Sequence, residues 1–262
     1  MALLNKLQEG DYLKLSYFDL LSPGPVYIQD TGGIISPTLK DISFIGIQTY
    51  QYYLGILSMS AQSFFEMSDL KEQYDMLPEE EKSKINIFEL LTGSNQMVSL
   101  LEKIFNFFMA DTVIYSPTDK YFIVKKDKDI VGTINRKNYN NVCNLIYQRN
   151  YIKYQSEDVN NIKSKKAAEI MKKIQKGKSN RRHSEPDKNF ELGNVISAVA
   201  SKSNSLNILN IWNLTVYQVW DCFARLSNNI IYDIQSMSVA AWGDKDNRFD
   251  AGAWFKTIDN DK

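Results

Sequence analysis

Histidine and cysteine, which supply many catalytic and metal sites, are scarce in this chain. It has one histidine, His183, and two cysteines, Cys143 and Cys222, which lie far apart in the sequence. No Cys-x-x-Cys pair occurs, and the single histidine lies in a polar stretch with no rigid catalytic neighbour. We therefore expect two free, mostly buried thiols, a reducing compartment, no metal site and no cofactor.

Long apolar runs and an excess of charge of one sign are also missing. No apolar run approaches about 18 residues, and the N-terminus does not have the layout of a signal peptide. The 31 basic and 31 acidic residues give a formal net charge of zero. We therefore expect a soluble cytoplasmic protein without membrane contact, and no overall field that would attract nucleic acid.

Two short motifs resemble ligand-binding loops but lack the glycine that each loop needs. Gly177-Lys178-Ser179 ends like a phosphate-binding loop, yet Lys172 stands where that loop requires its first glycine. The acidic residues after Asp244 resemble a calcium loop, yet Phe249 occupies the sixth position, where the tight turn requires glycine. The sequence therefore predicts a protein that is not an enzyme.

The clearest local signals describe one long amphipathic helix near the C-terminus. Thr215 and Gln218 have the spacing of a capping box, and Gly243 is a typical C-terminal stop. Between them, apolar residues recur every three or four positions and form a stripe of about seven turns. The stripe consists of Val219, Phe223, Leu226, Ile230, Ile234, Met237 and Ala241.

The N-terminal half mixes helices with short strands. Val26–Gln29 and 33–35 flank Asp30-Thr-Gly-Gly and predict a β-hairpin. Ser36-Pro37 predicts the start of a helix that runs to Leu57. The runs 112–115, 121–125 and 130–134 are separated by short polar turns, so they predict an antiparallel meander.

Composition changes sharply after residue 162. Nine basic residues follow within twenty positions, with Glu169 as the only acid among them. This basic patch consists of Lys163, Lys165, Lys166, Lys172, Lys173, Lys176, Lys178, Arg181 and Arg182. A solvated tether is the favoured interpretation, and contact with nucleic acid phosphates is the less favoured one because interleaved aromatic residues are missing.

These features together predict a predominantly helical α+β fold in two domains. We expect an N-terminal α+β domain over residues 1–155, in which helices accompany the small antiparallel meander. A basic flexible linker over 156–190 and a C-terminal helical domain over 191–262 complete the predicted order.

Several stretches together resemble small proteins encoded among the tail genes of tailed phages that infect Gram-positive bacteria. They are Ser22-Pro-Gly-Pro-Val-Tyr-Ile28, Ile35-Ser-Pro-Thr-Leu-Lys-Asp-Ile42, Ile45-Gly-Ile-Gln-Thr-Tyr-Gln-Tyr-Tyr-Leu54, Ile211-Trp-Asn-Leu-Thr-Val-Tyr-Gln-Val-Trp-Asp221 and Trp242-Gly-Asp-Lys-Asp246. Some proteins of this kind are called tail assembly chaperones. These stretches are patterns of packing residues and carry no catalytic motif.

The resemblance implies a non-enzymatic protein of the infected bacterial cytoplasm. Such a protein covers the long helical tape measure protein, or another tail protein, until tail tube subunits assemble around it. Apolar and aromatic helix faces suit that task, because an amphipathic helix docks into such surfaces. The candidate contacts are Tyr50, Tyr52, Tyr53, Trp212 and Trp220, and core packing is the alternative for each of them.

Two other functions stay open at this stage. The chain could be a structural protein of the virion, in the baseplate, the neck or the tail terminator. It could instead act on nucleic acid through the basic patch, with binding that weakens steeply as salt rises. A homo-oligomer is compatible with all three functions.

Overall fold

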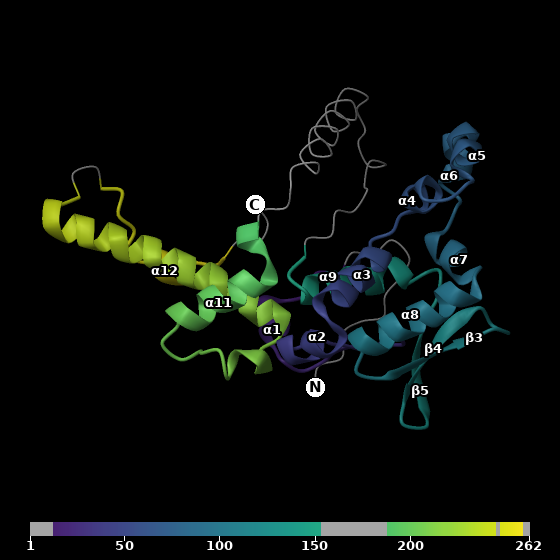
Figure 1. Ribbon diagram of the computed structural model, residues 1–262, viewed down its shortest axis with the longest axis horizontal. Helices are drawn as coiled ribbons and strands as arrows, with labels where there is room; N and C mark the ends of the chain where they lie inside the picture. The colour runs from purple at the N-terminus through teal and green to yellow at the C-terminus, as the bar shows by residue number, and fades with distance from the viewer. Residues whose placement is uncertain (1–12, 153–187, 245–246, 259–262) are drawn as a thin grey trace. The chain divides into compact units, whose positions relative to one another are not determined.

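The computed structural model describes residues 13–152, 188–244 and 247–258. The predicted fold class, α+β and predominantly helical, is confirmed (Figure 1). The chain forms two compact units: the first combines Met1–Ile152 with Trp212–Gln218, and the second combines Lys153–Ile211 with Val219–Lys262.

The first unit contains most of the helices and both sheets. Its helices are α1 Tyr17–Leu21, α2 Leu39–Ile45, α3 Ile47–Leu57, α4 Ala61–Glu66, α5 Lys71–Met76, α6 Glu79–Lys82, α7 Ile87–Thr92, α8 Asn95–Phe108 and α9 Tyr139–Arg149. Its strands are β1 Val26–Ile28, β2 Gly32–Ile34, β3 Thr112–Ser116, β4 Tyr121–Lys126 and β5 Asp129–Ile134. The 3₁₀ helix η3, Ile211–Asn213, crosses the boundary between the units.

The predicted hairpin and meander are both confirmed. Strands β1 and β2 pair antiparallel, with Val26 opposite Ile34. Asp30 in the turn and Gly32 at the start of β2 both have positive φ, a conformation that glycine and aspartate tolerate best. Strands β3, β4 and β5 form the antiparallel meander in sequence order.

One face of the meander supplies the core of the first unit. Val113, Phe122 and Val124 are buried, whereas residues between them on the strands are more exposed, as the two-residue period of a strand dictates. Helix α8 packs there, with the rings of Phe105 and Phe122 5.2 Å apart. Such aromatic contacts account for much of the burial in this unit.

The predicted start of the second helix at Ser36-Pro37 is wrong. The N-cap is Thr38, whose hydroxyl accepts a hydrogen bond from the Asp41 amide in a capping box. Thr38 is extended because it pairs with Thr215, and the Pro37 carbonyl accepts a hydrogen bond from the Val216 amide. The capping box is itself a local signal of this start, Thr38-x-x-Asp41, whereas the pairing with Thr215 joins segments far apart in sequence.

The helix predicted to run to Leu57 is also divided in two. Gly46 has φ +84° and ends α2, and α3 begins at the next residue. A left-handed backbone at this position suits glycine and interrupts the helical hydrogen bonds.

The second unit is helical in the part that the structure describes. It contains the 3₁₀ helices η2 Lys188–Phe190 and η4 Ala253–Phe255, the helix α11 Leu192–Lys202, and most of α12 Val216–Trp242. The predicted start and end of α12 are confirmed. The Thr215 amide donates to Gln218 Oε1, the Gln218 amide donates to Thr215 Oγ1, and Gly243 follows the last turn with φ +77°.

Candidate protein-binding surfaces

Helix α3 is fixed to the first unit by tyrosines on its inner side. The buried Tyr50 hydroxyl donates a hydrogen bond to Asn150 Oδ1 at 2.9 Å, and burial raises the pKa of Tyr50. Tyr53 is half-buried, with its ring 6.0 Å from that of Phe107. The Tyr147 hydroxyl also donates to the Leu54 carbonyl. The inner side of α3 therefore has little freedom to move.

The other side of α3 carries apolar and uncharged residues at the surface. Ile47 is 41% exposed and Tyr52 is 54% exposed, and Gln48 and Gln51 are exposed with them. We call these four residues the α3 outer face. No residue from Ile47 to Leu57 is charged, which is unusual for a surface helix. Exposed apolar groups on an uncharged helix are typical of a surface that binds another protein.

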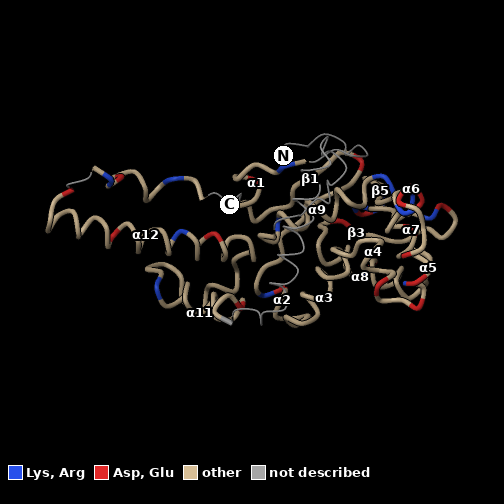
Figure 2. Tube along the Cα trace, turned by 90° about the horizontal axis from the view of Figure 1, so that it is seen from above, with Lys and Arg blue, Asp and Glu red and all other residues tan. Residues whose placement is uncertain are grey.

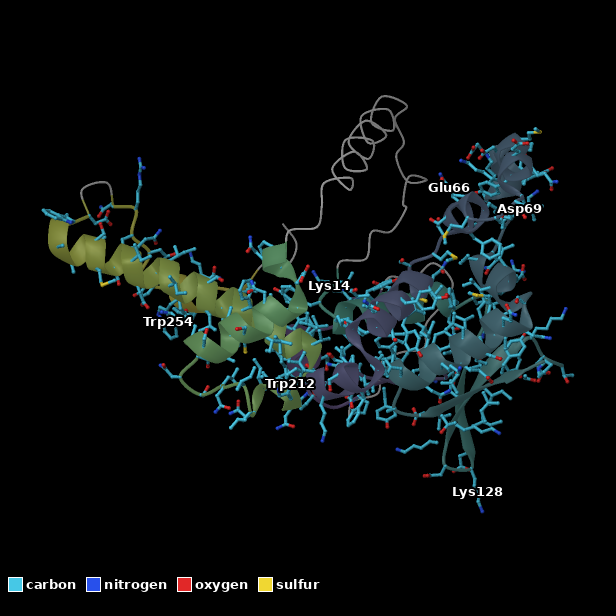
Figure 3. All side chains as sticks on the ribbon, viewed as in Figure 1. Lys14, Glu66, Asp69, Lys128, Trp212 and Trp254 are labelled. Atoms are coloured by element: carbon cyan, nitrogen blue, oxygen red, sulfur yellow. The ribbon has the colours of Figure 1, made fainter. Side chains whose placement is uncertain are left out.

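The five candidate contacts from the sequence lie in different environments. Tyr52 is on the α3 outer face, whereas Tyr50 is a core residue and Tyr53 is half-buried. Trp212 is exposed in η3, and its side chain is labelled in Figure 3. Trp220 is half-buried, with its ring 6.2 Å from that of Phe223. Core packing, the alternative for these residues, therefore holds for Tyr50.

Helix α12 carries a second apolar surface, in the second unit. The predicted stripe exists, but its burial changes along the helix: Val219 is fully buried, whereas Ile234 is 59% and Met237 64% exposed. We call the exposed part, Ile230, Ile234, Met237 and Ala241, the α12 seam. The sequence pattern predicts the stripe but gives no sign that its C-terminal half is uncovered.

The segment after α12 does not cover the α12 seam. The rings of Phe249 and Tyr232 lie 5.6 Å apart, and the Tyr232 hydroxyl donates to the Ala251 carbonyl at 3.3 Å. Arg225 Nη1 donates to the Lys256 carbonyl, one further contact of this segment. At 3.6 residues per turn, Tyr232 lies about 200° around the helix from Ile230. The described residues 247–258 of the C-terminal segment therefore contact the side of α12 opposite the seam.

Charge is nearly absent beside the α12 seam. Between Ser227 and Trp242, Asp233 is the single charged residue. Figure 2 shows few coloured positions along this helix. The flanking residues are mostly Ser, Asn, Gln and Ala, which are small or uncharged. A partner that covers the seam would therefore bury few charges, which favours association.

The basic patch, from Lys163 to Arg182, lies outside the described residues, as does His183. The predicted linker over 156–190 lies almost wholly outside them as well. The domain boundaries and the role of the basic patch therefore stay predictions.

Neither cysteine is activated as a nucleophile. Both are free, as predicted. Burial raises the pKa of Cys143 to about 12, and burial together with the nearby Asp221 raises the pKa of Cys222. A raised pKa lowers the thiolate fraction, and the thiolate is the reactive form.

Neither a cluster of metal ligands nor a membrane-spanning helix occurs in the part of the chain that the structure describes. Within residues 13–152, 188–244 and 247–258, no three His, Cys, Asp or Glu side chains gather as metal ligands would. No helix in these ranges combines the length and the apolar character needed to cross a membrane.

Comparison with known proteins points to a phage-type domain. A family model described as the YomV second domain matches residues 180–259, which contain α11 and α12. The match is consistent with a phage protein. It covers under a third of the 262 residues, so it describes similarity of this region only. No curated protein and no solved structure matches the chain.

Proposed function

We propose that this chain is a non-enzymatic phage protein that acts in tail assembly in the cytoplasm of the infected bacterium. It binds the tape measure protein through apolar helix surfaces and keeps it soluble until the tail tube forms. The observation that carries this proposal is the α3 outer face, an uncharged helix surface that exposes Ile47 and Tyr52 while Tyr50 holds the helix in place.

The physical argument is that a long amphipathic helix needs cover for its apolar side before assembly. A preformed uncharged surface gives such cover without the cost of ordering a flexible chain. Gln48 and Gln51 form a polar rim beside Ile47. Polar residues at the rim of an interface stay accessible to water, which makes later release of the partner easier. The link to tails comes from the sequence resemblance, and the match to a phage-type domain supports a phage origin.

Co-expression with the tape measure protein of the same phage tests this proposal. We expect the soluble fraction of the tape measure protein to rise when the chain is present. The double substitution Ile47→Asp with Tyr52→Asp should abolish the increase, because two carboxylates would be buried against an apolar partner. Ile130→Asp, at an exposed position of β5, is the matched control and should leave the increase intact.

Mass spectrometry of purified virions separates this function from a structural role. A chaperone is expected to be absent from finished particles. Recovery of the chain as a stoichiometric virion component would favour a protein of the baseplate, neck or tail terminator.

A further inference from the structure

The α12 seam has a spacing that reads the same in both directions along the helix. From Ile230 to Ala241 the intervals are four, three and four residues. The same intervals separate Val219, Phe223, Leu226 and Ile230, so α12 contains two successive 11-residue repeats. An 11-residue repeat stays close to the period of a straight helix, and the apolar stripe therefore drifts little around α12.

A second copy of α12 fits this seam when the two helices run antiparallel. In the register that centres between Ile234 and Met237, these two residues face one another across the pair. Ile230 then faces Ala241 of the second copy at each end. A large residue thus meets a small one at both ends, which fills space evenly. Antiparallel helices also align their dipoles favourably.

The charges permit this register. Asp233 lies on the flank of the seam, and the antiparallel register places Ser236 and Ala240 of the second copy beside it. Asp233 therefore retains access to water and does not face a like charge. The residues around it are uncharged from Ser227 to Trp242.

Parallel pairing fits less well for two reasons. It would place Met237 against Met237 and Ala241 against Ala241, so bulky contacts would hold the helices apart where alanine leaves a gap. The N-terminal part of α12 also has neighbours of its own: Phe190 of η2 lies with its ring 6.3 Å from that of Phe223. In a parallel pair, η2 of both copies would lie at the same end of the two helices.

The antiparallel register also places the most exposed tryptophan of α12 at the edge of the pair. Trp242 is 80% exposed, and it lies on the same flank of the helix as Ile231, three turns away. The register brings Trp242 of one copy within one turn of Ile231 of the other. The two Trp242 side chains can therefore add apolar area along the edges of the seam.

We infer that the chain forms a homodimer through the α12 seam, with two copies of α12 packed antiparallel around a two-fold axis between Ile234 and Met237. This surface consists of other residues than the α3 outer face, so the dimer and the proposed function can be tested independently. The interface is isologous, since the same patch of both copies takes part.

Light scattering after size exclusion tests the stoichiometry on the full chain. We expect a dimer at micromolar concentration. Ile234→Asp with Met237→Asp should weaken dimerisation at least tenfold, because it would bury four carboxylates in one interface. Asn228→Asp, on the other side of α12, is the matched control and should leave the dimer unchanged. Circular dichroism shows whether each variant remains helical. A folded wild-type monomer at micromolar concentration would overturn the inference.

Cysteine cross-linking tests the direction of the helices. In a Cys222→Ser background, one tagged copy carries Ile230→Cys and an untagged copy carries Ala241→Cys, two positions that face one another in the antiparallel register but lie about 16 Å from their own counterparts. The antiparallel register predicts that the mixed disulfide forms much faster than either symmetric one. Faster symmetric disulfides from each single variant would indicate parallel pairing and contradict the proposed register. The same cysteine variants can be co-expressed with the tape measure protein, and the solubility of that protein then reports separately on the α3 outer face.

Discussion

Gln218 Nε2 donates a hydrogen bond to the Leu21 carbonyl at 2.8 Å, although the two residues are 197 positions apart. The same side chain closes the capping box with Thr215 at the start of α12. One glutamine therefore caps a helix and also holds the C-terminal end of α1. The residues 212–218 belong to the first unit, in which Thr215 also pairs with Thr38.

Gln218→Ala should destabilise the first unit by about 1–2.5 kcal/mol, because it removes the cap and leaves the Leu21 carbonyl without this donor. Urea denaturation monitored by tyrosine and tryptophan fluorescence measures the change. Gln235→Ala, at an exposed position of the same helix, is the control and should change stability by less than about 0.5 kcal/mol. Equal effects of the two substitutions would show that the hydrogen bond to Leu21 contributes nothing to stability.

Arg149 is fully buried and holds the same N-terminal segment through backbone carbonyls. Its Nη1 donates to the carbonyls of Asp19 and Ser22, and its Nη2 donates to that of Gly24 at 2.8 Å. Burial lowers its pKa to about 10. The guanidinium thus replaces water for several carbonyls that local structure leaves unpaired.

Arg149→Lys should destabilise the first unit by about 3 kcal/mol. The single ammonium of lysine cannot donate to all the carbonyls that the two terminal nitrogens of the planar guanidinium reach. Arg136→Lys, at an exposed ion pair with Glu89, is the matched control and should cost under about 1 kcal/mol. Limited proteolysis should also cleave the segment near Ser22 faster in the Arg149 variant. Retention of wild-type stability in that variant would refute the role given to Arg149.

The thiol of Cys143 makes a specific pH prediction. Burial raises its pKa from 9.0 to about 12, so the folded chain keeps a proton that the unfolded chain loses first. The stabilising contribution is fully present below about pH 9 and is lost as the pH rises through about 12, with a slope of up to about 1.4 kcal/mol per pH unit. In a Cys222→Ser background, Cys143→Ala should flatten the decline between pH 9 and 11. Identical slopes with and without Cys143 would contradict this.

Gly132 allows the hairpin turn to lie directly on β5. An added Cβ would be 2.4 Å from the Thr31 amide nitrogen and 2.5 Å from the Asp30 carbonyl carbon, both of which are backbone atoms. Gly132→Ala should therefore destabilise the first unit by at least about 2 kcal/mol, because the backbone would have to move. Gly55→Ala in α3, where an added Cβ meets no atom within 4 Å, should stabilise it by about 0.5–1 kcal/mol. Thermal unfolding of the two variants gives the comparison, and shifts of the same sign would contradict this account.

Local signals in the sequence predicted the local structure well. The hairpin at Asp30, the meander and both ends of α12 depend on turn residues and caps that act within a few positions. The start of α2 was predicted two residues too early, at Ser36-Pro37, although Thr38 and Asp41 have the spacing of a capping box.

The candidate surfaces were harder to predict than the elements that carry them. Tyr50 and Tyr52 are two residues apart in one uncharged helix, yet one is buried against Asn150 and the other is exposed. The α12 stripe likewise shows a uniform pattern but is covered at Val219 and open at Met237. Which side of a helix is covered depends on tertiary packing, and a single-sequence pattern does not contain that information.

Hydrogen exchange on the purified complex with the tape measure protein tests directly whether α3 is the surface that binds this partner. We expect the amides of α3 from Ile47 to Tyr52 to exchange more slowly in the complex than in the free chain, because the partner would cover this helix. A complex in which exchange across α3 is unchanged would contradict it, and so would failure of the two proteins to associate.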